Sequence, residues 1–354
     1  MRKRGKILIA LGVGLAAFVL APILYIETGC RPGRGSIAGS NAASRLPAGE
    51  HRPFARTLLT YPEWHIVYSA DSLGRHLMAG KPPSVYRYGD DIKGFWSSYC
   101  AVNRAVGQDS AAGDAKVMTY TIGLSFTAEM LVKSFWENTI GSLAEWLGGW
   151  HSPDDRYAAR IQQNYGAFMH QTPWYRYPFG VAFDKLWTLG SEGHGVRHLE
   201  RQVALSAEYG VKAGYAKLIG AASGATLGRD KLTLRYIASA PDDAAAIVAP
   251  ARVVGHAGKD VVVEAPRYEI FSTMLETLAT RPVTLQEIAG NDRIFLTILQ
   301  RQEARPLEGS LLSMPLGDRP GWKRVGLIVA VPDLLSTIRS VKAEGGEFEH
   351  AYDY

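Results

Sequence analysis

The sequence contains few of the residue patterns on which familiar active sites are built. It has two cysteines in 354 residues, and neither belongs to a CxxC pair, which excludes a multi-disulfide framework and the usual zinc ribbons. It has no G-x-S-x-G nucleophile elbow, no GxxxxGK[ST] phosphate loop and no dinucleotide fingerprint at an expected strand–helix junction. Serine-hydrolase and nucleotide-binding chemistry therefore have no recognisable starting point in this chain.

The excess of charge of one sign is also small. The 39 basic and 34 acidic residues leave a formal charge of +5, part of which comes from the first few residues. A nucleic-acid-binding protein would need a clustered basic face, so we expect no nucleic-acid partner. With 47% hydrophobic and 21% charged residues, the chain can bury an ordinary core, and its length predicts about two domains.

The two cysteines, Cys30 and Cys100, have no sequence feature that brings them together. We therefore expect Cys100 to be a buried structural thiol. A single Cys30–Cys100 disulfide is the alternative, and its formation depends on backbone geometry that the sequence does not reveal.

The one long hydrophobic run lies at the N-terminus. Residues 7–26 are uncharged and apolar, and Arg2, Lys3, Arg4 and Lys6 precede them. About 20 such residues span a bilayer as a helix, and the basic cluster should stay in the cytoplasm. The pattern predicts a membrane anchor over residues 1–30, in the inner (cytoplasmic) membrane, with a single span and the bulk of the chain outside the cytoplasm.

Two alternatives exist for this run. A cleaved signal peptide usually has a shorter apolar region and a small-residue cleavage site close behind it. A lipoprotein would carry its lipid on Cys30, but Glu27, Thr28 and Gly29 lack the usual apolar residue of that signal. We expect an uncleaved anchor, followed by a flexible Gly/Ser/Ala/Pro-rich tether over residues 31–52.

Residues 53–227 are predicted to form a mainly α-helical middle domain. Thr60 and Glu63 have the spacing of a capping box at the start of one helix, and Ser152 with Pro153 begins another. A helix over about 194–222 should bury the stripe of Leu199, Val203, Val211 and Leu218.

A second membrane span is considered over residues 117–147, but charges interrupt it and charges are costly inside a bilayer. We expect a core helix, with a helix at the membrane surface, where Trp136, Trp146 and Trp150 would suit the interface, as the alternative. Its Glu129, Lys133 and Glu137 are four residues apart and should form a solvent-facing ladder. If the ladder were buried, its carboxylates could perform acid–base work.

From residue 228 the hydrophobic period changes to that of strands. Strands are predicted in LTLRYIA, DVVVEAPR, VTLQEIA, RIFLTIL, WKRVGLIVAV and EFEHAYDY, with helices over 268–279 and 332–343. Gly-Asn-Asp between VTLQEIA and RIFLTIL predicts a hairpin turn. The order predicts an α+β, ferredoxin-like domain over residues 228–354, a fold that hosts many functions.

Candidate site residues are few. His194 and His198 would lie on one face of a helix, as metal ligands require, and the catalytic candidates beside them are Glu63, His65 and Glu137. A third ligand could come from His65, His76, His151 or His170. Trp174, Tyr175 and Tyr177 could line a ligand pocket, although such aromatics more often pack under a loop.

Together these features predict a membrane-anchored extracytoplasmic binding or scaffold protein. Its ligand is a small molecule or an envelope protein partner of unspecified identity. The competing hypothesis is a metal- or haem-dependent envelope enzyme that uses the His/Glu cluster of the helical domain.

Overall fold

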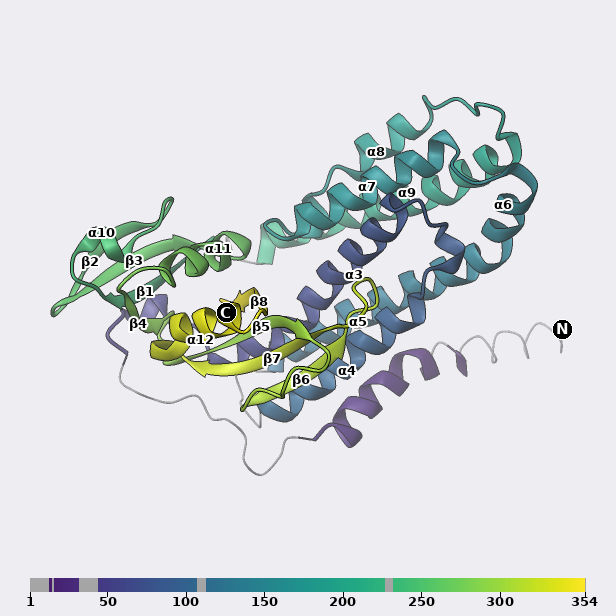
Figure 1. Cartoon of the computed structure of the whole chain (residues 1–354). Helices are drawn as coiled ribbons and strands as arrows, with labels where there is room; N and C mark the ends of the chain where they lie inside the picture. The colour runs from purple at the N-terminus through teal and green to yellow at the C-terminus, as the bar shows by residue number, and fades with distance from the viewer. Residues whose placement is uncertain (1–12, 15, 32–43, 107–112, 227–231, 354) are drawn as a thin grey trace.

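A computed structural model describes residues 13–14, 16–31, 44–106, 113–226 and 232–353. The molecule is elongated, with a helical bundle at one end and two sheets at the other (Figure 1). Residues 16–24 are helical and lead into a π-helical turn, η1. The remaining helices are α2 (Phe54–Leu59), α3 (Tyr61–Met78), α4 (Tyr88–Val106), α5 (Gly113–Trp136), η5 (Glu137–Gly141), α6 (Ser142–Gly148), α7 (Pro153–Met169), α8 (Phe179–Leu186), α9 (Gly195–Thr226), α10 (Asp243–Ala246), α11 (Glu269–Leu278) and α12 (Leu334–Ala343), with η1 at Tyr25–Gly29 and short 3₁₀ turns η2 (Ala48–Glu50), η3 (Pro83–Val85), η6 (Trp174–Arg176) and η7 (Val331–Asp333).

The strands form two four-stranded antiparallel sheets within the described part of the chain. The first has the order β2-β3-β1-β4 and the second the order β6-β7-β5-β8. The strands are β1 (Thr233–Ser239), β2 (Arg252–Ala257), β3 (Asp260–Pro266), β4 (Thr284–Ile288), β5 (Arg293–Arg301), β6 (Ser310–Pro315), β7 (Trp322–Ala330) and β8 (Glu347–Tyr352).

The two sheets repeat one topology. In each, the first strand lies between the third and the fourth, and the well-formed helix, α11 or α12, connects the third strand to the fourth. The α+β class is therefore confirmed. The single ferredoxin-like sandwich predicted for residues 228–354 is wrong, because the strands divide between two sheets and β2 and β6 each add a strand that the sequence pattern left out.

The predicted hairpin between β4 and β5 is wrong for the same reason. Ala289 and Gly290 have positive φ angles of 48° and 82°, and Ile288 and Asn291 exchange backbone hydrogen bonds of 3.0 and 2.9 Å. The tight turn is thus present. However, β4 pairs with β1 whereas β5 pairs with β7 and β8, so the turn joins the two sheets instead of two neighbours in one sheet.

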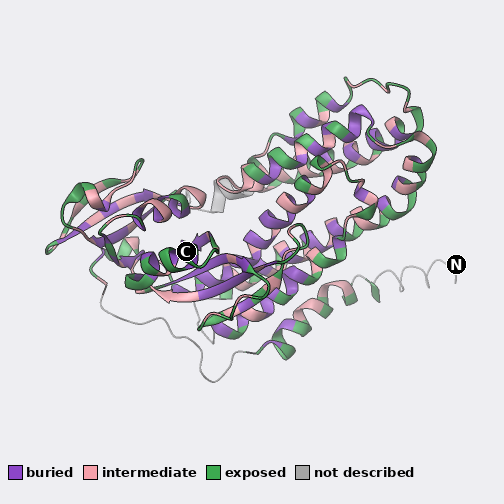
Figure 2. Ribbon diagram, in the orientation of Figure 1, coloured by how far each residue is buried: buried purple, intermediate pink, exposed green. Residues whose placement is uncertain are grey.

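One hydrophobic core joins α2–α5 to both sheets. Tyr61 of α3 packs edge-on against Phe295 and Tyr352 of the second sheet, at ring-centroid distances of 5.6 and 5.5 Å. A smaller cluster lies under α7–α9. Figure 2 shows buried residues along the strands and where helices face one another. The predicted boundary near residue 227 falls in 227–231, outside the described residues, and stays a prediction.

Of the two predicted helix caps, one is confirmed. Ser152 and Asp155 form a full capping box at the start of α7. Thr60 does not cap α3: its backbone is helical and its hydroxyl donates to the Arg56 carbonyl oxygen at 2.7 Å. The prediction of a Thr60–Glu63 box is wrong because α2 leads almost directly into α3, so Thr60 already lies in a helical turn.

On the long helices α5 and α9, the buried and exposed faces are the reverse of those predicted. The stripe expected to be buried on α9 is exposed: Leu199 by 65%, Val203 by 49%, Val211 by 72% and Leu218 by 66%. The expected solvent-facing ladder on α5 is turned inward, with the Lys133 side chain only 15% exposed. The periodicity correctly predicts which residues share a face of each helix. The face that it predicts to be buried is the exposed one.

Cys30 and Cys100 form a disulfide with an S–S distance of 2.06 Å, so the expectation of a free thiol at Cys100 is wrong. Asn103 donates to the Cys30 carbonyl oxygen at 3.0 Å and Arg104 to that of Gly29 at 3.0 Å. The end of the N-terminal helix is thus fixed to α4 by one covalent bond and two hydrogen bonds.

Most of the predicted anchor is described as helix, but residues 1–12 and 15 lie outside the described residues. Among the residues that are described, no helix has both the length and the apolarity of a membrane span. Residues 32–43 of the predicted tether are likewise outside the description. Its described end lies against the first sheet, where Arg45 forms a 2.6 Å ion pair with Asp260.

Candidate functional site

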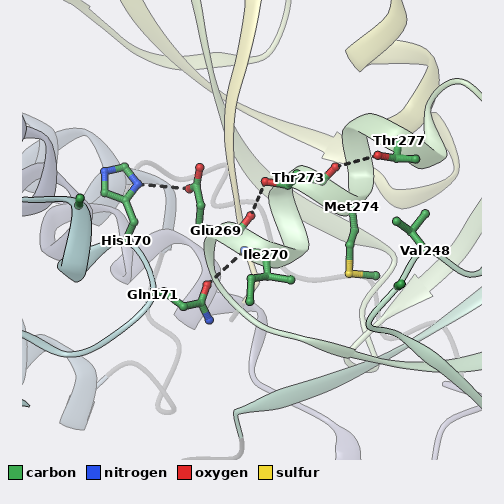
Figure 3. A pocket seen from close by; sticks show the side chains of 10 residues that line it. His170, Gln171, Val248, Glu269, Ile270, Thr273, Met274 and Thr277 are labelled. Atoms are coloured by element: carbon green, nitrogen blue, oxygen red, sulfur yellow. Dashed lines mark hydrogen bonds and ion pairs between the residues drawn. The ribbon is translucent and has the colours of Figure 1, made fainter.

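A cavity of about 310 Å³ lies where the helical bundle meets the first sheet. Figure 3 shows its side chains converging from the end of α7, the loop before β2 and one side of α11. The lining residues are Ala167, His170, Gln171, Val248, Ala249, Glu269, Ile270, Thr273, Met274 and Thr277. Its size is at the lower end for small-molecule sites.

His170 is the central polar group of this pocket. Its Nε2 lies 2.7 Å from Oδ2 of Asp71 on α3, and its Nδ1 lies 3.3 Å from Oε2 of Glu269 on α11. A close crossing of α3 and α7 makes the first contact possible, because a Cβ atom at Gly166 would lie 2.5 Å from Oδ1 of Asp71. Gly74 leaves similar room, since a Cβ there would be 3.1 Å from the Cα of Gln163.

The two carboxylates determine the protonation state of His170. Burial disfavours the charged ring, but the hydrogen bonds and charges of Asp71 and Glu269 outweigh burial and raise the pKa of His170 to about 10. Burial raises the pKa of Glu269, but the hydrogen bonds and charges of His170 and His350 together outweigh burial and lower the pKa to about 2. At neutral pH the pocket therefore contains an imidazolium between two carboxylates.

A second histidine lies behind this group. The His350 ring stacks on Trp64 at 3.7 Å between centroids, and its Nδ1 is 2.8 Å from the Ser272 hydroxyl, which also accepts a 3.0 Å hydrogen bond from the Ala351 amide. The Ser272 hydroxyl therefore connects Nδ1 of His350 with the backbone of β8, and Nε2 is the other ring nitrogen. That buried nitrogen has no hydrogen-bond partner among the described residues.

The pocket contains few groups free to react. Gln171 donates to the Arg267 carbonyl oxygen and accepts from the Ile270 amide, at 3.2 Å each. The hydroxyl of Thr273 donates to the Glu269 carbonyl oxygen at 3.0 Å, and both nitrogens of His170 face carboxylates. These groups fix the shape of the pocket, whereas its apolar walls remain available for contact with a ligand.

His65 and Glu137, two of the catalytic candidates, have structural partners. His65 is buried, its Nε2 is 3.0 Å from the Asp91 carbonyl oxygen, and burial lowers its pKa to about 4, so the ring is neutral. Glu137 accepts two 2.9 Å hydrogen bonds from Arg201. Burial raises the pKa of Glu137 even though Arg201 opposes the shift.

Glu63, the third catalytic candidate, is half-buried in the first turn of α3. It is not among the residues that line the pocket. The structure therefore does not bring Glu63, His65 and Glu137 together in the cavity.

The metal candidates His194 and His198 bond to different groups. Nδ1 of His194 is 2.8 Å from the Gly148 carbonyl oxygen, and Nδ1 of His198 is 2.7 Å from Oδ2 of Asp154. Within the described ranges, no set of three or more His, Cys, Asp or Glu side chains is placed to hold a metal ion. The metal assignment stays a prediction.

The aromatic candidates lie a few residues beyond His170. Trp174 packs against Tyr215 at 5.5 Å, and Tyr175 against Trp174 at 6.3 Å. Tyr177 packs against Tyr165 at 5.3 Å. Trp174 and Tyr177 pack against the cluster under α7–α9, and none of the three candidates lines the cavity.

Sequence reasoning missed Asp71, Glu269 and His350, and it considered His170 only as a third metal ligand. His170 is 99 residues from both of its carboxylate partners, so no local spacing joins them. The glycines Gly74 and Gly166, which permit the α3–α7 crossing, were the available signal. Comparison of the chain with protein-family models, curated proteins and solved structures gives no match in any of the three.

Proposed function

We propose that this chain is a membrane-anchored binding protein of the cell envelope. Residues 7–26 form its single span in the inner (cytoplasmic) membrane, the N-terminus is cytoplasmic, and the body lies outside the cytoplasm. The ligand site is the His170 pocket. The apolar walls of the pocket favour a small, mostly apolar molecule, because the polar groups of the pocket already pair with protein groups.

The observation that carries this proposal is the Cys30–Cys100 disulfide. Disulfides persist in oxidising compartments and are rare where thiols are kept reduced. Cys30 follows the apolar run by four residues, so the bond supports an extracytoplasmic position for the part of the chain directly after the span.

Thiol trapping in intact cells tests the placement. Cells are treated with N-ethylmaleimide, and the denatured full chain is then reduced and labelled with a heavier maleimide. We expect both cysteines to carry the heavier label, because the disulfide protects them from the first reagent. If both carry N-ethylmaleimide, the body is in a reducing compartment and the proposed placement is wrong.

Native mass spectrometry of the full chain extracted from its own membrane tests the pocket. We expect a small molecule to remain bound to the wild type and to be lost in Thr273→Trp, which fills the cavity. Thr280→Trp, just after the same helix and also exposed but not among the residues that line the pocket, is the matched control and should retain it. Equal occupancy in both variants would place the ligand elsewhere.

The metal- or haem-dependent enzyme remains the alternative to this proposal. It predicts a stoichiometric metal or chromophore in the purified protein that disappears when His194→Ala and His198→Ala are combined. Elemental analysis and an absorption spectrum of both proteins decide between the two functions.

A further inference from the structure

The outer side of the helical bundle is apolar over two long helices. On α5 and α6, Val132 is 67% exposed, Phe135 68% and Trp146 79%; on α9, Leu199 is 65% and Val211 72% exposed. We call these five exposed apolar side chains together the apolar face. A water-facing helix normally exposes its charged side and buries the apolar one, so the apolar face needs a covering other than water.

The charges of the same helices point into the bundle. Lys133 and Lys212 both contact Glu129 and Glu208, at distances between 2.8 and 3.0 Å. The four groups comprise two positive and two negative charges. Their pairing removes the need for water around this part of the bundle.

A second internal network continues toward α6 and α7. Arg197 is fully buried and donates to Asp155 and Glu200, at 2.8 and 2.9 Å. Arg201 bonds to Glu137 and to Glu200. Ionisable side chains that face inward, pair with one another and leave apolar side chains outside are typical of helices in contact with lipid.

The predicted anchor brings the apolar face to a bilayer. Glu27, in the turn after the apolar run, accepts a 2.6 Å hydrogen bond from Tyr120 of α5, and the neighbouring Cys30 is bonded to α4. Figure 1 shows the N-terminal helix running beside α4 and α5. A bilayer that surrounds this helix therefore also reaches the outer side of α5, where Val117 is 66% exposed.

Aromatic residues favour lipid over a second protein as the covering. Trp146 near the end of α6 and Trp187 after α8 are 79% and 56% exposed. Tryptophan is enriched where headgroups meet acyl chains. Along α5 and α6, Val117, Phe135 and Trp146 are 66%, 68% and 79% exposed, so exposed apolar side chains recur along both helices.

We propose that the apolar face of α5, α6 and α9 is in contact with lipid of the bilayer that the N-terminal anchor spans. The inference rests on the proposed anchor and goes beyond it, because it assigns the body its own lipid contact. The anchor then fixes the protein to the membrane, and the apolar face sets the orientation of the body on it.

Site-directed spin labelling of the full chain in phosphatidylcholine–phosphatidylglycerol vesicles tests this. Labels are placed on Phe135→Cys and Leu199→Cys in the apolar face, on Leu20→Cys in the anchor and on Lys342→Cys, whose native side chain is 47% exposed on α12. Labelling is done without reductant so that the native disulfide stays intact. Accessibility to oxygen and to a water-soluble nickel complex is then measured at each site.

We expect labels at 20, 135 and 199 to be accessible to oxygen and to lose accessibility to nickel, and the label at 342 to show the reverse. If 135 and 199 behave like 342 while 20 remains in lipid, the face proposal is wrong and the anchor stands. Nickel access at 20 would overturn both proposals. Low accessibility of 135 and 199 to both reagents would mean that protein covers the face, which also overturns the lipid contact.

Discussion

His170 connects two parts of the molecule that are far apart in the sequence. Asp71 comes from the helical bundle and Glu269 from α11 of the α+β part. An imidazolium paired on both sides stabilises the folded chain only while it carries its proton. The geometry of the pocket therefore depends on pH through this one residue.

The sign of that dependence is fixed by the pKa of His170, which rises from 6.5 to about 10 on folding. Its contribution to stability is complete below about pH 6.5 and is lost as the pH rises through 10. We expect His170→Gln to lower the free energy of unfolding by about 1–2 kcal/mol at pH 7. The variant should also lack the part of the decrease in stability at alkaline pH that comes from deprotonation of His170.

Urea unfolding of the detergent-solubilised full chain between pH 6 and 11 measures this difference. His256→Gln is the control, because His256 pairs with Asp243 at the surface, where both side chains are about half exposed. If the free energy of unfolding depends on pH in the same way for the wild type and His170→Gln, the ion pairs of His170 do not contribute as proposed.

Single residues also show what sequence could foresee. Ser152 was assigned correctly because a cap depends on partners within three residues. His170 and His350 depend on partners 99 and 78 residues away. No spacing rule in one sequence reaches across such distances, so their roles follow only from the fold.

At the scale of elements, the crossing of α3 and α7 determines whether Asp71 can reach His170. We expect Gly166→Ala to destabilise the protein by about 1–3 kcal/mol, because the added Cβ would lie 2.5 Å from Oδ1 of Asp71. Gly180→Ala in α8 is the control, since a Cβ there meets nothing within 4 Å. Thermal unfolding of both variants checks the prediction, and equal melting temperatures would refute the close crossing.

The junction of α6, α7 and α9 depends on Arg197. We expect Arg197→Leu to cost about 3–5 kcal/mol, because Asp155 would remain buried without its cation and Glu200 would keep only Arg201. Arg156→Leu removes an exposed ion pair with Glu192 and should cost less than about 1 kcal/mol. Chemical denaturation of the two variants measures the contrast, and similar losses would show that the Arg197 network is not buried.

Helix α9 shows that the sequence can predict a helix without predicting which of its faces is buried. Leu199, Val203 and Val211 share one face, as the periodicity indicated, and Arg197 and Arg201 share the other. Periodicity identifies faces but not their surroundings. The usual rule that apolar means inward fails here, because the structure turns the arginines toward the acidic side chains of η5 and α7.

At the scale of the whole molecule, the disulfide closes a segment of 70 residues between the N-terminal helix and α4. On the chain-entropy account, a loop of this length contributes about 4 kcal/mol. We expect the Cys30→Ser, Cys100→Ser double variant to lose a substantial part of this stabilisation. The N-terminal helix should then separate from α4.

Hydrogen exchange of residues 16–31 and 95–106 checks the prediction, with the wild type under non-reducing conditions as reference. Faster exchange confined to these segments is the expected result. Unchanged exchange would mean that the hydrogen bonds of Asn103 and Arg104 alone hold the helix.

The global arrangement of strands was only partly predictable. Six strands and both long helices of the α+β part follow from hydrophobic period and turn residues. Their division into two sheets does not, because β4 and β5 are separated by a tight turn that reads equally well as a hairpin. Only pairing partners distant in sequence, such as Ile237 with Glu287 and Thr297 with Gly326, distinguish the two arrangements.

The position of β8 has a consequence for the order in which the molecule can form. Tyr352 accepts a hydrogen bond from Thr57 through its carbonyl oxygen and contacts Tyr61 and Tyr68, so a strand that follows every other described element fills the space beside α3. Contacts between residues almost 300 positions apart form slowly. During synthesis, α2 and α3 must remain without their final neighbour until residue 352 has emerged, and the apolar surface they present over that time is a natural point for chaperone contact or aggregation.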